Sequence, residues 1–144
     1  MQPIVDRFGF KVLREVDQPD FAEVVYTNDT TGLSAAVDWS EFRPFVHIHQ
    51  LIDGQLPADP ISYASNDQLK SFDIDDLLRL RANEGSPVGK MLGERDNAAA
   101  RRLMDEYAKA LEQHASDVLC GGFTVFAELD RVVKTRARGM KQKS

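Results

Sequence analysis

Cysteine is almost absent from this chain, since Cys120 is the one cysteine among 144 residues. A single thiol excludes an intramolecular disulfide and is typical of proteins in a reducing compartment. No stretch approaches the roughly 18 consecutive apolar residues that a membrane-spanning helix needs. The first residues also lack the apolar core of a signal peptide, because Asp6 and Arg7 interrupt them. These absences predict a cytoplasmic protein that makes no membrane contact.

Sequence motifs for catalysis are also missing. There is no Gly-x-Ser-x-Gly sequence, so serine hydrolase chemistry has no support. The segment from Gly85 to Met91 resembles a phosphate-binding loop, but its glycine spacing is one residue short and Met91 replaces the magnesium-binding Ser or Thr. Cys120 falls at the predicted end of a helix, where the negative pole disfavours a thiolate, so we expect a small buried side chain there. We expect no cofactor and interpret the chain as non-catalytic.

Charge is distributed unevenly along the chain. The formal net charge is −5, yet residues 134–144 hold five lysines and arginines and no acid. Residues 1–133 therefore hold 13 basic and 23 acidic side chains, a net charge of −10. An acidic body repels nucleic acid and attracts basic partners, so we expect a basic protein partner and disfavour nucleic acid. We interpret residues 1–133 as a single domain and residues 134–144 as a flexible basic tail, and the oligomeric state stays open.

Residues 9–52 have the pattern of consecutive strands. A weak alternation covers residues 9–16, and three stronger strands, rich in β-branched and aromatic residues, cover 21–27, 33–39 and 45–52. Their connections are short, so neighbouring strands should pair in an antiparallel meander. Within 33–39 the expected core side chains are Leu33, Ala35, Val37 and Trp39, with Ser34, Ala36 and Asp38 on the opposite face. In the last strand we expect Val46 and Ile48 to face the core.

The second half of the chain has helical periodicity. Asp73 is the expected N-cap of a helix that ends before Gly85. The longest helix is predicted from about Asp96 to Cys120, where Gly121-Gly122 stops it. Thr124 should cap a final helix whose expected apolar side is Phe126, Leu129, Val132 and Val133. The predicted fold is α+β: an antiparallel meander of about four strands, with two to three C-terminal helices packed on one face.

His47 and His49 are the first candidates for a site. Residues two apart on a strand share a face, so both imidazoles should project side by side, opposite the core. Two neutral imidazoles could ligate zinc or another divalent metal, with Asp38 on the neighbouring strand as a third ligand. The competing interpretation is that both histidines are ordinary polar residues, exposed or lying under the long connection 53–70. We expect the apolar residues Leu56, Ile61 and Tyr63 to hold that connection on the body.

Two further groups of polar residues have simple structural explanations. Asp73, Asp75 and Asp76 could bind a cation or a basic partner, but acids at the start of a helix are commonly there to complement its dipole. His114 lies near the apolar stripe of the long helix and is expected to pack at its edge. The alternative to an interaction protein is therefore a small-ligand or metal-binding protein or enzyme. Its site would lie between the 53–70 connection and the face of His47 and His49.

The order of the predicted elements also resembles a known group of proteins. The segments that carry the likeness are Gly9-Phe10, Val24–Thr27, Thr31-Gly32-Leu33, Ser71–Arg79 and Leu119–Phe123, the last followed by Phe126 and Leu129. This order resembles small uncharacterised bacterial cytosolic α+β proteins, some of which are grouped with the immunity proteins of toxin systems. The resemblance implies a bacterial protein that docks onto a toxin or another regulator. The shared motifs are caps and turns, so no functional residue transfers.

Overall fold

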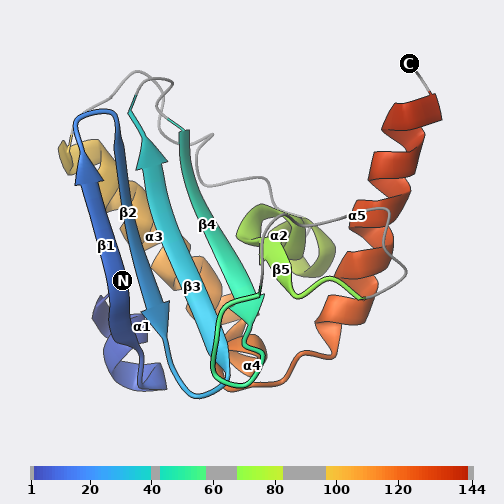
Figure 1. Cartoon of the computed structure of the whole chain (residues 1–144), viewed down its shortest axis with the longest axis horizontal. Helices are drawn as coiled ribbons and strands as arrows, with labels where there is room; N and C mark the ends of the chain where they lie inside the picture. The colour runs from blue at the N-terminus through green and yellow to red at the C-terminus, as the bar shows by residue number, and fades with distance from the viewer. Residues whose placement is uncertain (1, 40–42, 58–67, 83–96, 143–144) are drawn as a thin grey trace.

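The computed structural model describes residues 2–39, 43–57, 68–82 and 97–142 of the chain. The strands in these ranges are β1 (Lys11–Gln18), β2 (Phe21–Thr27), β3 (Thr31–Asp38), β4 (Arg43–Gln50) and β5 (Ser71–Asp73). The helices are α1 (Gln2–Phe8), α2 (Ile74–Ala82), α3 (Asn97–His114), α4 (Ser116–Leu119) and α5 (Val125–Gln142). Each strand pairs antiparallel with the next to give one open sheet in the order β1-β2-β3-β4-β5 (Figure 1). The predicted α+β meander is confirmed.

Two strands differ from the predicted set. β5 was not predicted, because three residues are too few for an alternating pattern to emerge from the sequence. It extends the sheet by pairing Asp73 with His47 and Ser71 with His49. β1 begins two residues later than predicted, since Gly9 adopts the left-handed conformation (φ 71°) that turns the chain from α1 into the sheet.

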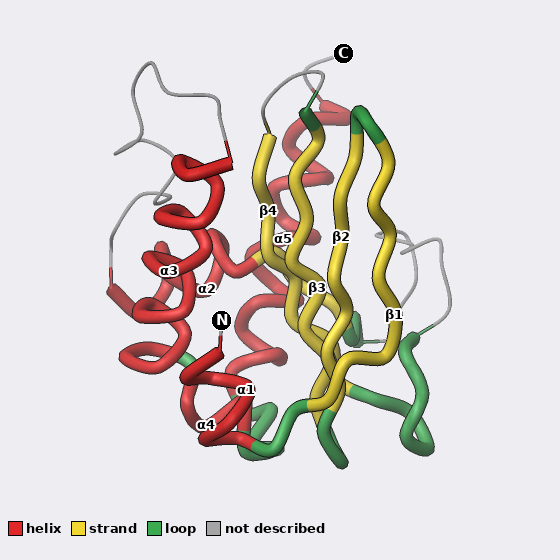
Figure 2. The backbone as a smooth tube through the Cα atoms, turned by 90° about the vertical axis from the view of Figure 1, so that its left-hand side faces the viewer, coloured by secondary structure: helices red, strands yellow, loops and turns green. Residues whose placement is uncertain are grey.

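Helices cover one face of the sheet. Figure 1 shows α3 behind the strands and α2 and α5 beside β4 and β5, and Figure 2 shows α1, α2, α3 and α4 on one side of the sheet. The core lies between these layers, and its sheet side includes Val46 and Ile48, as predicted. The fully buried residues that α2, α3 and α5 contribute to it are Ile74, Leu77, Leu78, Leu103, Tyr107, Leu111, Phe126 and Leu129.

β3 is buried on both faces, contrary to the prediction of one core face. Leu33 and Val37 are buried as expected, but Ser34 and Ala36 on the opposite face are buried as well. β3 is the central strand, and the segment after β4 lies over its helix-free face. A Cβ added to Gly32 would come within 2.8 Å of the Leu56 side chain. Leu56 thus fixes the start of the 53–70 connection, as predicted, whereas Ile61 and Tyr63 lie outside the described residues.

The long helix predicted from residue 96 to 120 is interrupted. α3 ends at His114, Ala115 leaves the helical conformation (φ −130°, ψ 17°), and α4 then forms a separate turn of helix. Arg81 of α2 binds at this break: it donates a 2.6 Å hydrogen bond to the His114 carbonyl and pairs with Asp117 at 2.7 Å. A contact from another helix therefore satisfies a backbone acceptor at the C-terminal end of α3.

The twin glycines end α4 as predicted. Gly121 adopts φ +96°, and its N–H donates to the Val118 carbonyl, while the Gly122 N–H donates to the Asp117 carbonyl at 2.7 Å. These two bonds form the Schellman motif, which favours glycine at the left-handed position. The expectation for Cys120 is wrong, because its side chain is exposed. The short helix buries Val118 and Leu119 instead.

α5 begins after Thr124, as predicted, and buries Phe126, Leu129 and Val133. Val132 is 44% exposed, so its assignment to the apolar side is wrong. The predicted boundary between residues 133 and 134 falls inside this helix, which continues to Gln142. Lys134 is buried, and its ammonium lies 3.1 Å from the Asp130 carboxylate one turn earlier. None of the helices in the described ranges is long and apolar enough to span a membrane.

Asn28 joins three segments of the fold and provides a test of the packing. Its side-chain amide donates to the carbonyls of Phe8 and Leu119, each at 3.0 Å, and its Oδ1 accepts the N–H groups of Thr30 and Thr31. Asn28→Asp keeps the acceptor but places a carboxylate against the two carbonyls. We expect the free energy of unfolding to fall by about 2 kcal/mol, measured by urea denaturation.

The neighbouring exposed residue provides the matched control for this substitution. Asp29→Asn makes the reverse chemical change at a side chain outside the network, and it should change the free energy of unfolding by less than about 0.5 kcal/mol. Equal effects of the two substitutions would show that Asn28 does not hold α1 and α4 to the β2–β3 turn.

Candidate binding cavity at the edge of the sheet

A polar cavity of about 300 Å³ lies where β4, β5, α2 and α5 meet. β5 and the first turns of α2 form most of its wall, and α5 closes one side. Its lining residues are His47, Ser71, Phe72, Asp73, Asp75, Asp76, Arg79, Val133 and Arg136. The cavity therefore brings together carboxylates, guanidinium groups, an imidazole and a hydroxyl from segments that are distant in the sequence.

Asp73 positions the acidic side of the cavity. It is the last residue of β5, and its Oδ1 accepts the Asp75 N–H at 2.8 Å, which is the hydrogen bond of an N-cap. This confirms the predicted cap. The chain turns here from strand into helix, so Asp75 and Asp76 follow within the first turn of α2, where the helix dipole stabilises negative charge.

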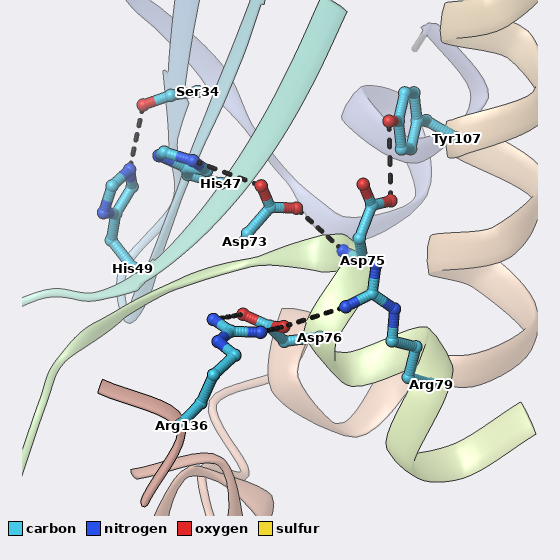
Figure 3. A network of polar contacts seen from close by, with 9 residues as sticks. All are labelled: Ser34, His47, His49, Asp73, Asp75, Asp76, Arg79, Tyr107 and Arg136. Carbon is cyan, nitrogen blue, oxygen red and sulfur yellow. Dashed lines mark hydrogen bonds and ion pairs between the residues drawn. The ribbon is translucent and has the colours of Figure 1, made fainter. Parts of the chain in front are cut away.

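Asp76 is the buried anchor of the cavity. Arg136 of α5 donates two hydrogen bonds to its two carboxylate oxygens, at 2.8 and 3.3 Å. Arg79, one turn further along α2, lies 4.0 Å from the same carboxylate (Figure 3). The predicted basic tail thus supplies a structural ion pair, since Arg136 holds the C-terminal half of α5 against α2.

Asp73 and His47 face each other on adjacent strands. The His47 Nε2 lies 3.7 Å from the Asp73 Oδ2, and about 38% of each side chain is exposed. Burial pushes the pKa of Asp73 upward, but the hydrogen bonds from His47 and from the Asp75 N–H outweigh it, and the pKa falls below its ordinary value. Asp73 is therefore ionised at neutral pH.

The two histidines share a face, as predicted, but they have different surroundings. Their ring centroids are 6.3 Å apart. His49 lies between two hydroxyls, with Ser34 Oγ 2.9 Å from Nε2 and Ser71 Oγ 2.6 Å from Nδ1. His47 lines the cavity beside Asp73 (Figure 3). The sheet therefore gives His49 a structural role between β3 and β5 and leaves His47 at the site.

Asp38 does not join the histidines. It pairs with Arg43 at the far end of β3, whereas His47 pairs with Ser34. The four residue steps from Ser34 to Asp38 span about 13 Å of extended strand. Among the residues described, no group of three or more His, Cys, Asp or Glu side chains is arranged to hold a metal ion.

Sequence reasoning found the acids of the cavity but interpreted them as helix-start residues, and it missed both arginines. The Asp76–Arg79 spacing of three residues on a helix was a usable signal, because such residues are neighbours on its surface. The sequence around Arg136 did not indicate a place in the cavity, because its role depends on how α5 packs against α2. Ser34 and Ser71 were likewise recognisable only from the register of the sheet.

Comparisons of the chain with protein-family models, with curated proteins and with solved structures found no match. The side chains that line the cavity are therefore the basis for its binding chemistry. Figure 3 shows Asp73 at the end of β5, Asp75 in the first turn of α2, and Arg79 and Arg136 around Asp76. The arrangement presents both hydrogen-bond acceptors and hydrogen-bond donors.

The Asp76–Arg136 pair should control the order of the C-terminal half of α5. Arg136→Gln leaves Asp76 buried, with the Arg79 guanidinium 4.0 Å away as a cationic neighbour. We expect the amides of residues 134–142 to exchange faster with solvent and the free energy of unfolding to fall by about 1–2 kcal/mol, allowing for the part-exposed guanidinium. Arg138→Gln, at an exposed position on the same helix, is the control. Equal exchange in the two variants would contradict the role of the pair.

The pH dependence of Asp73 gives a second test of the site. Because its pKa is lowered in the folded protein, Asp73 contributes stability above the unfolded pKa of about 3.9, and this contribution is lost as pH falls through the folded value. We expect NMR titration of the Asp73 carboxyl carbon to give a midpoint below that unfolded value. In His47→Gln the midpoint should move upward, because the imidazole that stabilises the carboxylate is lost. An unchanged midpoint would show that His47 does not stabilise the carboxylate.

Proposed function

We propose that this chain is a non-catalytic protein-interaction module that binds a basic protein partner. The long-range field of the chain is acidic, since residues 1–133 carry a net charge of −10. Such a field attracts a basic partner and speeds its association, while it disfavours nucleic acid. The resemblance to proteins grouped with immunity proteins points in the same direction, towards a toxin or another regulator as partner.

The observation that carries the proposal is that cations of the basic segment 134–144 form ion pairs with acids of residues 1–133. Lys134 pairs with Asp130, and Arg136 pairs with Asp76, within one continuous helix. Each cation has a carboxylate partner on the body of the protein, with Lys134 buried and Arg136 about half exposed, which favours a structural role over a basic arm for a nucleic acid. The helix also places the C-terminal cations on the same body as the acids, so the excess of negative charge dominates the encounter with a partner.

The surroundings of His49 support a structural role over catalysis. A serine nucleophile with a histidine base needs a third group, usually a carboxylate, that orients the second ring nitrogen. Both ring nitrogens of His49 instead contact hydroxyls, those of Ser34 and Ser71. Cys120 follows the C-terminal end of α4, whose negative pole disfavours the reactive thiolate.

A small-ligand protein is the second candidate, and one observation favours it. His47, which the sequence singled out, lines the cavity at the edge of the sheet. Among the residues described, β4, β5, α2 and α5 line this cavity, and most of the expected wall, residues 58–67, lies outside the described residues. Its volume of about 300 Å³ is at the lower end of the range for small-molecule sites.

The interaction proposal is tested by the rate of association with a basic protein recovered from a native lysate of the source organism. A variant with Asp105→Asn, Glu106→Gln and Glu112→Gln removes three acids from α3, among them the Glu112 partner of Arg7. We expect the association rate constant to fall for this variant and, for the wild type, to fall steeply as salt is raised. Surface plasmon resonance at several salt concentrations measures both effects.

A matched variant on the same helix separates charge from local contact. Arg101→Gln, Arg102→Gln and Lys109→Gln remove three bases from the same helix. This variant should associate at least as fast as the wild type, because it is more acidic. Similar slowing by both variants, or association that is independent of salt, would contradict electrostatic attraction of a basic partner. Recovery of only acidic proteins or nucleic acid would contradict the partner class.

A further inference from the structure

The lining of the cavity carries charges of both signs. Asp73 ends β5 beside His47, and Asp75 follows it with its carboxylate 3.5 Å from the Tyr107 hydroxyl, whereas Arg79 and Arg136 lie around Asp76 (Figure 3). A ligand with only a cation would meet the two guanidinium groups, and a ligand with only an anion would meet three carboxylates. The lining therefore favours a molecule that carries both kinds of charge.

Asp73 has the chemistry to receive the cationic end of such a molecule. Its carboxylate is ionised, about 37% of the side chain is exposed, and one oxygen accepts the Asp75 N–H while the other lies 3.7 Å from the His47 Nε2. A carboxylate has about four acceptor positions, so further donors can bind to it. The Ser71 hydroxyl and the Asp75 carboxylate add polar groups to the same part of the lining.

Arg79 has the chemistry to receive the anionic end. Its side chain is 62% exposed, and its contact with Asp76 is at the 4.0 Å limit of an ion pair. Exposed pairs at this distance contribute little, so the guanidinium can turn towards a ligand at small cost. Its five N–H donors match a carboxylate through two parallel hydrogen bonds. Arg136, by contrast, is already bound to both oxygens of Asp76.

We propose that this cavity binds a small zwitterionic molecule with a cationic side group, of the chemical class of the basic amino acids. Asp73 and Asp75 contact the guanidinium or ammonium group, and Arg79 contacts the carboxylate. The lining holds three carboxylates and two guanidinium groups, so a ligand with two cations and one anion brings the site close to neutrality. This binding activity does not depend on the protein partner proposed above.

The test is a titration of the isotopically labelled full chain, followed by amide NMR, with three small probes at equal ionic strength. L-Arginine carries both charges, L-citrulline replaces the guanidinium by a neutral group of similar shape, and agmatine lacks the carboxylate. We expect L-arginine to shift the amides of residues 71–79 with a Kd of about 1 mM, a value ordinary for a small ligand in an open site. L-Citrulline and agmatine should each bind at least about fivefold more weakly.

Two variants assign the ends of the ligand. Arg79→Gln should weaken the binding of L-arginine about fivefold and leave the binding of agmatine unchanged, because agmatine has no carboxylate for Arg79 to contact. Asp73→Asn should weaken the binding of L-arginine and of agmatine to similar extents. Arg131→Gln and Asp17→Asn, at exposed positions outside the cavity lining, are the matched controls and should bind as the wild type does. Thermal melting of each variant establishes that it is folded.

Several results would overturn the proposal. L-Citrulline binding as tightly as L-arginine would show that the cation is not recognised. Agmatine binding as tightly as L-arginine, or equal weakening of both by Arg79→Gln, would show that the carboxylate is not recognised. Shifts spread over the whole acidic surface, or no shifts in residues 71–79 at millimolar probe, would exclude the cavity as the site. If Asp73→Asn does not fold, the comparison of probes and the exposed Arg79→Gln variant still decide the question.

Discussion

The pairing of β5 with β4 determines where the acidic groups of the cavity lie. Three residues, Ser71 to Asp73, add a strand to the sheet, and the last of them caps the next helix with its own side chain. A strand and a helix joined without a loop have little freedom relative to each other. Asp75 and Asp76 therefore follow Asp73 at fixed positions. The same strand pairing brings the imidazole of His47 beside Asp73.

The second constraint is the burial of Asp76. A carboxylate removed from water is strongly unfavourable unless cations and hydrogen bonds replace its hydration. Arg136 supplies two hydrogen bonds, and this requirement fixes how α5 crosses α2. The pair need not add much net stability, because desolvation offsets the attraction. Its physical role is specific: among ways of packing an amphipathic helix on this core, it favours the one that places Arg136 at the cavity.

The sequence was sufficient for features that depend on neighbours in the chain. The strands, the cap at Asp73 and the stop at Gly121 follow from alternation, capping chemistry and left-handed glycine, and each is present in the structure. The break at Ala115 could not be predicted, because Arg81 of another helix occupies the carbonyl at that point.

The same distinction separates the parts of the site. The shared face of His47 and His49 follows from the period of a strand, and the structure confirms it. Whether Asp38 reached them depended on register, and the register puts it at the other end of β3. Arg136 was assigned to a tail because five cations without an acid resemble a solvated chain end. Only the position of a buried acid on α2 gives that arginine a function.

The shared carboxylate links the cavity to the C-terminal helix. Arg79 and Arg136 both contact Asp76, at 4.0 and 2.8 Å. A change in one contact therefore alters how far the buried carboxylate depends on the other for its stabilisation. An anion that draws Arg79 away leaves Asp76 dependent on Arg136, and the pair that holds α5 becomes more important to the buried charge. Conversely, an α5 that frays frees Asp76 to attract Arg79 and removes the donor that the ligand carboxylate would use. Occupancy of the cavity and order of the C-terminal helix are therefore expected to rise together, since one buried carboxylate connects them.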